Sequence, residues 1–175
     1  MKKISVHKIA LMGILTAATI VIAIAESFIP SIGIPGVKLG LANIMILITL
    51  YELGILEAVV VNLFRVFVVG LVRGTIFSMG FYMSLAGAFL SLLVMILLYL
   101  LVRKFSIIGV SVVGSLFHVT GQIIVAMFFL GTAYIFYYLP IIAISAIITG
   151  VFVGIVAKLI IRTGVIRKQK ERYNF

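Results

Sequence analysis

The sequence predicts an all-α fold, a polytopic membrane protein in which six transmembrane helices form one bundle. Of the 175 residues, 65% are hydrophobic and only 10% are charged, and the mean hydropathy is +1.41. A soluble domain carries roughly 25% charged residues, so we expect lipid to surround most of this chain. Proline, glycine and charged residues interrupt the apolar sequence at intervals that suit helices crossing a bilayer. We expect residues 1–175 to form a single membrane domain.

The interruptions divide the chain into six predicted spans. They run at about 8–28, 39–53, 55–73, 76–102, 107–130 and 134–161, and a basic tail follows at 162–175. The second span is short, since a transmembrane helix needs roughly 20 apolar residues. Ala23-Ile-Ala25 resembles a signal-peptidase site, but the preceding apolar run is longer than that of a signal peptide, so we favour a retained first span.

The distribution of basic residues predicts the orientation of the bundle. With six spans, both termini lie on one side of the membrane, and most basic residues then share that side: Lys2, Lys3, Lys8, Arg103, Lys104, Arg162, Arg167, Lys168, Lys170 and Arg172. Lys38 and Arg73 lie on the opposite side. Because basic residues concentrate in cytoplasmic segments, we expect a multi-pass protein of the cell membrane with both termini in the cytoplasm.

Two features of the first span and the loop after it point to interactions. Ala10, Gly13 and Ala17 place small side chains on one side of the first helix, a spacing that permits close approach of another helix. The neighbour is either a helix of the same bundle or a partner protein. The following stretch, residues 29–40, contains two prolines and three glycines and cannot continue a helix. It is either a lid over the bundle or a static connector.

The third span carries the strongest functional signal. Asn62, Arg65, Val69 and Arg73 fall on one side of a helix, within roughly 80° of arc. An arginine inside a bilayer costs roughly 3 kcal/mol or more, so it normally faces protein or a water-filled cavity. Arg65 therefore contacts either a solute or structural partners, which are backbone carbonyls or Glu57. Arg73 contacts the solute or extends to the membrane surface.

Other polar residues are predicted to gather with Arg65. In the six-span topology Lys38, Asn43, Arg73, Tyr82 and Gln122 fall in the outer half of the bundle, whereas Arg65 and His118 lie near mid-depth. A solute site is one interpretation, and hydrogen bonds between helices are the alternative, above all for His118 and Gln122. Three basic groups without an acid nearby favour a carboxylate or phosphate ligand. The predicted substrate-binding residues are Lys38, Asn43, Asn62, Arg65, Arg73, Tyr82, His118 and Gln122.

Composition argues against several other functions. The chain has no cysteine and no aspartate, and its four glutamates are Glu26, Glu52, Glu57 and Glu171. We therefore expect no metal site, no cofactor and no enzymatic activity, because phosphate chemistry through magnesium needs clustered carboxylates. A phosphate-binding loop of the type Gly-x-x-x-x-Gly-Lys is absent. The net charge of +10 resides mostly at span ends, so it does not indicate nucleic-acid binding.

Residues 36–87 carry a resemblance to a known family. The sequence Gly36-Val-Lys38-Leu-Gly40-Leu-Ala-Asn43-Ile, then Leu-Tyr51-x-Leu-Gly54-x-x-Glu57-Ala, and then Arg65, Gly74-Thr75, Ser78 and Ser84-Leu-Ala-Gly87 resembles the Gx transporter family. This family is also labelled heptaprenyl diphosphate synthase component I. It is in turn similar to the substrate-binding S components of energy-coupling factor (ECF) transporters, six-helix membrane proteins with both termini inside.

The resemblance implies a role in uptake. An S component binds a micronutrient such as a vitamin from outside, and docks through small residues of its first helix on a transmembrane coupling subunit that carries two ATPase subunits. Ala10, Gly13 and Ala17 suit this docking role, although many S components have an alanine pair where this chain has Gly13 and Ala17. The expected solute is a small anionic micronutrient or a prenyl- or quinone-type precursor. The alternative, which rests on the family label, is a noncatalytic membrane subunit associated with a polyprenyl diphosphate synthase.

Overall fold

The computed structural model describes residues 6–28, 38, 40–101 and 105–166. The candidate lid at 29–40 therefore lies outside the described residues except for Lys38 and Gly40, and the basic tail is described only as far as Ile166. The described part is all-helical, as predicted. It contains six α-helices and one 3-10 helix: α1 (Val6–Glu26), α2 (Asn43–Glu52), α3 (Ile55–Val72), α4 (Met79–Leu101), α5 (Ile107–Leu130), η1 (Ala133–Tyr138) and α6 (Leu139–Thr163).

Five of these helical stretches are long and apolar enough to cross a membrane: α1, α3, α4, α5 and the continuous η1–α6 stretch. Large apolar side chains remain exposed on the outside of the bundle, as in Phe64, Phe89 and Phe128. An exterior of this kind suits lipid rather than water. The helix α2 has only 10 residues, which is shorter than a span, so the count of six spans stays a prediction.

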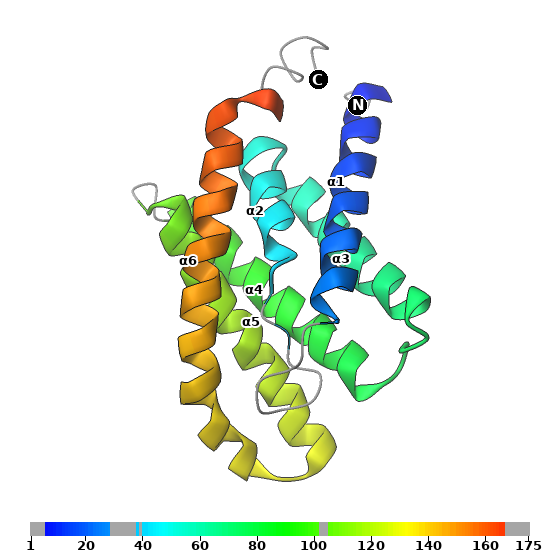
Figure 1. The fold of residues 1–175 in the computed structure, drawn as a ribbon, viewed down its shortest axis with the longest axis vertical. Coiled ribbons are helices and arrows are strands. Elements are labelled where there is room, and N and C mark those ends of the chain that lie inside the picture. The colour runs from blue at the N-terminus through cyan, green and yellow to red at the C-terminus, as the bar shows by residue number, and fades with distance from the viewer. Residues whose placement is uncertain (1–5, 29–37, 39, 102–104, 167–175) are drawn as a thin grey trace.

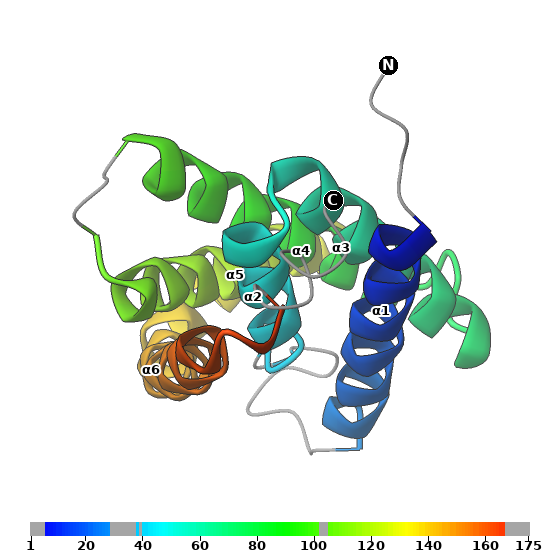
Figure 2. The same cartoon turned by 90° about the horizontal axis from the view of Figure 1, so that it is seen from above.

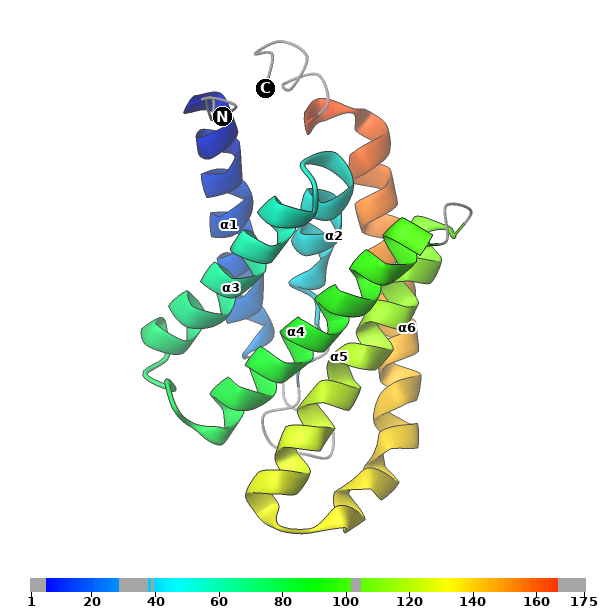
Figure 3. The same cartoon turned by 180° about the vertical axis from the view of Figure 1, so that it is seen from behind.

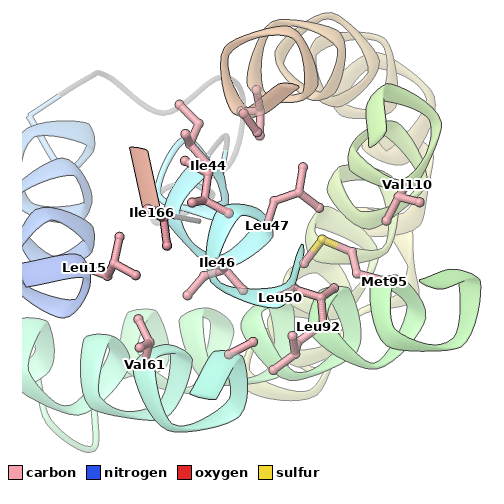
Figure 4. Packing of buried hydrophobic residues seen from close by; sticks show 14 residues of the cluster. Leu15, Ile44, Ile46, Leu47, Leu50, Val61, Leu92, Met95, Val110 and Ile166 are labelled. Atoms are coloured by element: carbon pink, nitrogen blue, oxygen red, sulfur yellow. The ribbon is translucent and has the colours of Figure 1, made fainter. Parts of the chain in front are cut away.

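The short helix α2 occupies the centre of the bundle. It lies between α1 and α6 in two perpendicular views (Figure 1, Figure 2). Ile46, Leu47 and Leu50 have no exposed surface, and Figure 4 shows them surrounded by side chains of α1, α3, α4 and α5. Neighbours cover most of α2, which suits a helix whose residues from Ile44 to Leu50 are apolar apart from Thr49.

The helices α4, α5 and α6 pack on one another at glycines. A Cβ atom built on Gly121 of α5 would lie 2.8 Å from the carbonyl oxygen of Ala86 in α4. A Cβ atom on Gly154 of α6 would lie 2.7 Å from the Cα atom of Ile108 in α5. Since these distances leave no room for any side chain, the backbones of the three helices are in contact.

Figure 3 shows α3, α4 and α5 on the face opposite to the view of Figure 1.

Local signals in the sequence explain the ends of α5 and α6. The Ser106 hydroxyl accepts a hydrogen bond from the Gly109 backbone N–H (3.0 Å) and caps α5. The same helix ends at Gly131 in the left-handed conformation, with φ of 63°. Pro140 lies in the first turn of α6, where a missing backbone N–H is tolerated. The start of α1 and the end of α6 lie at the same end of the bundle (Figure 1).

Candidate functional site

A cavity of about 170 Å³ lies between α1, α3, α4 and α5. It is lined by residues from these helices and from the segments before α2 and after α3: Ala23, Glu26, Lys38, Arg65, Val66, Val69, Gly70, Arg73, Thr75, Gly80, Phe81, Ser84 and His118. Four of the predicted site residues are among them, namely Lys38, Arg65, Arg73 and His118. The helix α6 contributes no residue to this lining.

Arg65 is buried and held by two asparagines. Its Nη2 donates a hydrogen bond to Oδ1 of Asn62 one turn earlier in α3 (2.9 Å), and its Nη1 donates to Oδ1 of Asn43 at the start of α2 (3.5 Å). Each asparagine amide is fixed in turn, that of Asn62 by the carbonyl of Ala88 (3.0 Å) and that of Asn43 by the hydroxyl of Ser91 (3.3 Å). Asn43 and Asn62 thus position the guanidinium, and neither lines the cavity.

Backbone carbonyls and Glu57 are the structural partners considered above for Arg65. Glu57 forms an ion pair with Lys8 of α1, whereas the recorded partners of Arg65 are Asn43 and Asn62. The amide oxygens of Asn43 and Asn62 carry no net charge and do not neutralise the guanidinium, whereas the carboxylate of Glu26 lines the same cavity. A guanidinium also carries five N–H donors, and the two recorded bonds leave others to face the cavity.

The segment before α2 is hydrogen-bonded to α5 and to α1, two helices that line the cavity. The backbone N–H of Lys38 donates to Oε1 of Gln122 in α5 (3.0 Å). The backbone N–H of Gly40 donates to Oε1 of Glu26 in α1. Gly40 has a φ of +84°, and a Cβ atom there would lie 3.1 Å from Nδ2 of Asn43 and 3.4 Å from the ring of His118. Glycine is therefore favoured at this position by conformation and by space.

His118 and Gln122 form a polar pair one helical turn apart. The Nε2 atoms of the two side chains lie 2.8 Å from each other. If the Gln122 amide donates, the imidazole is neutral and carries its proton on Nδ1. Gly87 of α4 makes room for this pair, because a Cβ atom there would lie 3.1 Å from Cε1 of His118 and 3.0 Å from Cγ of Gln122. Gln122 is completely buried and supports Lys38 and His118 instead of lining the cavity.

The cavity carries an excess of positive charge but also one acid. Lys38, Arg65 and Arg73 line it together with Glu26, and Glu26 is 5% exposed. The expectation of three basic groups with no acid nearby is therefore wrong, because the chain returns Lys38 and Gly40 to the end of α1. Burial lowers the pKa of Lys38, just before α2, and the Glu26 carboxylate opposes this shift only in part. Three cations and one carboxylate leave a net charge of about +2.

Tyr82 lines a different hollow. A groove of about 550 Å³ lies between α3 and α4, and its walls are apolar apart from Asn62 and Tyr82. Leu63 and Phe89 on its walls are 44% and 61% exposed, so the groove opens on the outer surface of the bundle. Tyr82 packs its ring against Phe81 and Phe129, with centroids 5.7 and 5.6 Å away.

The residues predicted for partner docking share the exposed side of α1. Ala10, Gly13 and Ala17 are all exposed, and no atom lies within 4 Å of a Cβ atom built on Gly13. The buried side of α1 is formed by Leu15, Thr19, Ala23 and Glu26. The small residues therefore do not pack within the described part of the bundle.

Several cavity residues were not singled out from the sequence. Glu26 directly follows an apolar run and falls near the end of the predicted first span at 8–28. Thr75 and Ser84 also line the cavity. The sequence offers three signals: Glu26 at the end of a long apolar run, Lys38 about a dozen positions later, and Gly40 two positions after Lys38. They do not reveal that Gly40 and Lys38 come to lie beside Glu26.

Within the described ranges, no three His, Asp or Glu side chains gather as ligands for a metal ion. The comparison with curated proteins gave no match to this chain, and neither did the comparison with solved structures. A family model described as heptaprenyl diphosphate synthase component I matches residues 15–160, which include every residue that lines the cavity. The chain therefore belongs to the heptaprenyl diphosphate synthase component I family.

Proposed function

We propose that the protein is a non-enzymatic membrane subunit that binds a small anionic solute for an ATP-driven importer of the ECF type. The observation that carries this proposal is Arg65, which is 5% exposed and lines a cavity whose described residues include three basic side chains and the carboxylate of Glu26. A buried charge of this kind is costly unless something compensates it. Glu26 offsets one of the three positive charges of Lys38, Arg65 and Arg73, and an anionic ligand in the cavity would offset the rest.

The surrounding groups suit a carboxylate or phosphate. A guanidinium binds such groups through two parallel N–H donors, and Lys38 and Arg73 add positive charge on the same cavity. The ring of Phe81 and the side chains of Val66 and Val69 provide apolar contacts. We infer a solute with an anionic group and a partly apolar body, such as a vitamin-like micronutrient or a prenyl- or quinone-type precursor.

The exposed small residues of α1 support a partner in the membrane. Without large side chains at Ala10, Gly13 and Ala17, another helix can approach the α1 backbone closely. In this proposal the partner is a transmembrane coupling subunit that carries two ATPase subunits. Both termini then lie in the cytoplasm of a cell-membrane protein, in keeping with the common end of α1 and α6 in Figure 1.

A second candidate function is favoured by the family description. The words "synthase component I" suggest a noncatalytic membrane subunit associated with a polyprenyl diphosphate synthase. In this role, the cationic cavity would bind a diphosphate-bearing substrate or product near the membrane. Both candidates therefore require an anion at Arg65, and they differ in the proteins that accompany the subunit.

Binding to the purified protein tests the shared requirement. Arg65→Gln should weaken binding of the co-purifying anion by about tenfold to a hundredfold, because hydrogen bonds to charged groups contribute about 1.5–3 kcal/mol. Arg162→Gln is the matched control, since Arg162 is exposed in the last turn of α6 and outside the cavity lining. Size-exclusion chromatography checks that both variants remain folded. Equal affinity in the parent and in Arg65→Gln would remove the basis of the proposal.

Co-purification from the native membrane separates the two candidates. An importer subunit should carry a transmembrane coupling subunit and ATPases with it, and Gly13→Leu should reduce their recovery because it fills the close-approach surface. Val21→Ala changes another exposed position of α1 and is the control. Recovery of a soluble prenyl-transferring enzyme without ATPases would favour the second candidate instead.

A further inference from the structure

We propose that the ligand is a single-chain amphiphile whose anionic head lies in the cavity at Arg65 and whose hydrocarbon chain lies in the groove between α3 and α4. This inference rests on the proposed function and specifies the class of its ligand. It rests on three properties of the two hollows: their position relative to each other, their volumes and their opposite chemistry.

The two hollows lie next to each other on α3, where they share the lining residue Val66. Val66 lines both of them, the cavity on the side of Arg65 and the groove on the side of Asn62. The hydrogen bond from Arg65 to Asn62 (2.9 Å) links the two walls. On α4 the neighbours Phe81 and Tyr82 line the cavity and the groove respectively. A ligand that crosses Val66 would therefore contact both sites at once.

The volumes suit a divided ligand. Small-molecule sites usually enclose about 300–1,000 Å³, and the cavity, at about 170 Å³, falls below this range. It has room for a compact head group and little more. The groove adds about 550 Å³, and the two hollows together reach the usual range. The groove is thus the nearest space for the rest of a larger ligand.

The chemistry of the walls divides in the same way. The cavity has three cations and one carboxylate, whereas the groove wall is apolar apart from Asn62 and Tyr82. The Asn62 amide already donates to the carbonyl of Ala88, and its oxygen accepts from Arg65. It offers the groove little unpaired polarity, so a hydrocarbon chain fits there without leaving a buried polar group unsatisfied.

The groove is open to the outside of the bundle, so the hydrocarbon chain of a ligand can enter it there. Leu63 and Leu93 on the groove walls are each 44% exposed on the outside of the bundle. In a membrane this surface faces lipid, so an amphiphile can place its chain in the groove sideways from the bilayer. A lipid of the surrounding bilayer is the competing occupant, and it would fill the groove without any dependence on Arg65.

A chain-length series tests the inference on the full-length protein in detergent. The probes are alkyl phosphates and the matching alkanoates with two and ten carbons. In the parent, the ten-carbon member of at least one series should bind at least tenfold more tightly than the two-carbon member. Leu63→Trp narrows the groove and should abolish most of this gain while leaving affinity for the short anion within twofold. Leu71→Trp, at an exposed α3 leucine that lines neither hollow, should behave as the parent.

The outcomes separate the two proposals. If short and long anions bind equally and both depend on Arg65, the groove holds no part of the ligand and only the proposed function survives. If Leu71→Trp abolishes the higher affinity of the ten-carbon anion as fully as Leu63→Trp does, the hydrocarbon chain of the ligand is not bound specifically in the groove. The inference then fails. If no anion of either series binds, the proposed function itself fails. Ala86→Leu narrows the groove from α4 and replaces Leu63→Trp should that variant not fold.

Discussion

The α4–α5–α6 half of the bundle and the α1 helix are held in place in different ways. Along α5 the neighbouring backbones touch at Gly121 and Gly154, and such contacts exclude any side chain. By contrast α1 packs with a few buried residues on α2 and α3, and it is joined to them by the Lys8–Glu57 ion pair and the Glu26–Gly40 hydrogen bond. Its Gly13 has no neighbour within 4 Å.

This difference indicates a division of roles. The close-packed helices form a rigid frame that fixes His118, Gln122 and Ser84, because interiors packed at this density have few alternative arrangements. The cavity lies where this frame meets α1 and α3. A helix with fewer buried contacts opens at lower free energy, so access to the cavity would involve α1 before it involves the frame. Substitutions in α1 and in the α4–α5–α6 frame test this difference.

The largest effect is expected at the frame. Gly121→Leu forces a side chain into the Ala86 backbone and should destabilise the protein by about 3 kcal/mol, seen as a large loss of thermal stability in detergent. Gly13→Leu is the matched change in α1. A Cβ atom at position 13 meets no atom within 4 Å, and leucine favours the helix over glycine by roughly 0.8 kcal/mol, so stability should stay unchanged or rise slightly. Equal destabilisation by both changes would contradict the contrast between the halves.

A smaller effect is expected at the end of α1. Glu26→Gln keeps an oxygen that accepts from the Gly40 N–H but removes the one carboxylate that lines the cavity. The cavity then becomes more positive, and affinity for an anion should rise by about fivefold, or about 1 kcal/mol. Isothermal titration with the anion that binds the parent measures this change, and Glu52→Gln, outside the cavity lining, serves as control. A fall in affinity would mean that Glu26 contacts the ligand as a hydrogen-bond acceptor.

The smallest effect is expected at the other end of α1. Lys8→Gln breaks the ion pair with Glu57, whose two side chains are 29% and 11% exposed. Partly exposed pairs contribute about 0–1 kcal/mol, so thermal unfolding should shift by only a few degrees. Lys158→Gln on α6 is the control for loss of one positive charge. Loss of more than about 2 kcal/mol would show that α1 depends on this pair far more than the contrast allows.

The fold class was predictable because it depends on composition and on long apolar runs. The cavity was predictable in part, since Arg65 and His118 stand out in apolar segments and both line it. Tyr82 shows the limit of such reasoning. It is next to Phe81 in sequence, yet successive residues of a helix point about 100° apart, and only Phe81 reaches the cavity.

The sequence alone did not predict that α2 is buried inside the bundle or that Glu26 lines the cavity. A short apolar run does not reveal whether it spans a membrane or is buried inside a bundle, and α2 is surrounded by other helices. Glu26 lies at the cavity beside Lys38 and accepts a hydrogen bond from Gly40, a contact over 14 residues that no local pattern encodes. The two asparagines that accept hydrogen bonds from Arg65 lie on different helices, Asn43 on α2 and Asn62 on α3. The pairing of Asn43 with Arg65 is likewise a long-range contact.

Mass spectrometry of the purified protein tests the central claim most directly. The account predicts that the parent retains a small molecule with a carboxylate or phosphate group and an apolar portion, and that Arg65→Gln releases it while Arg162→Gln retains it. Recovery of the same molecule in equal amount from parent and Arg65→Gln would contradict the claim that the buried guanidinium binds an anion in this cavity.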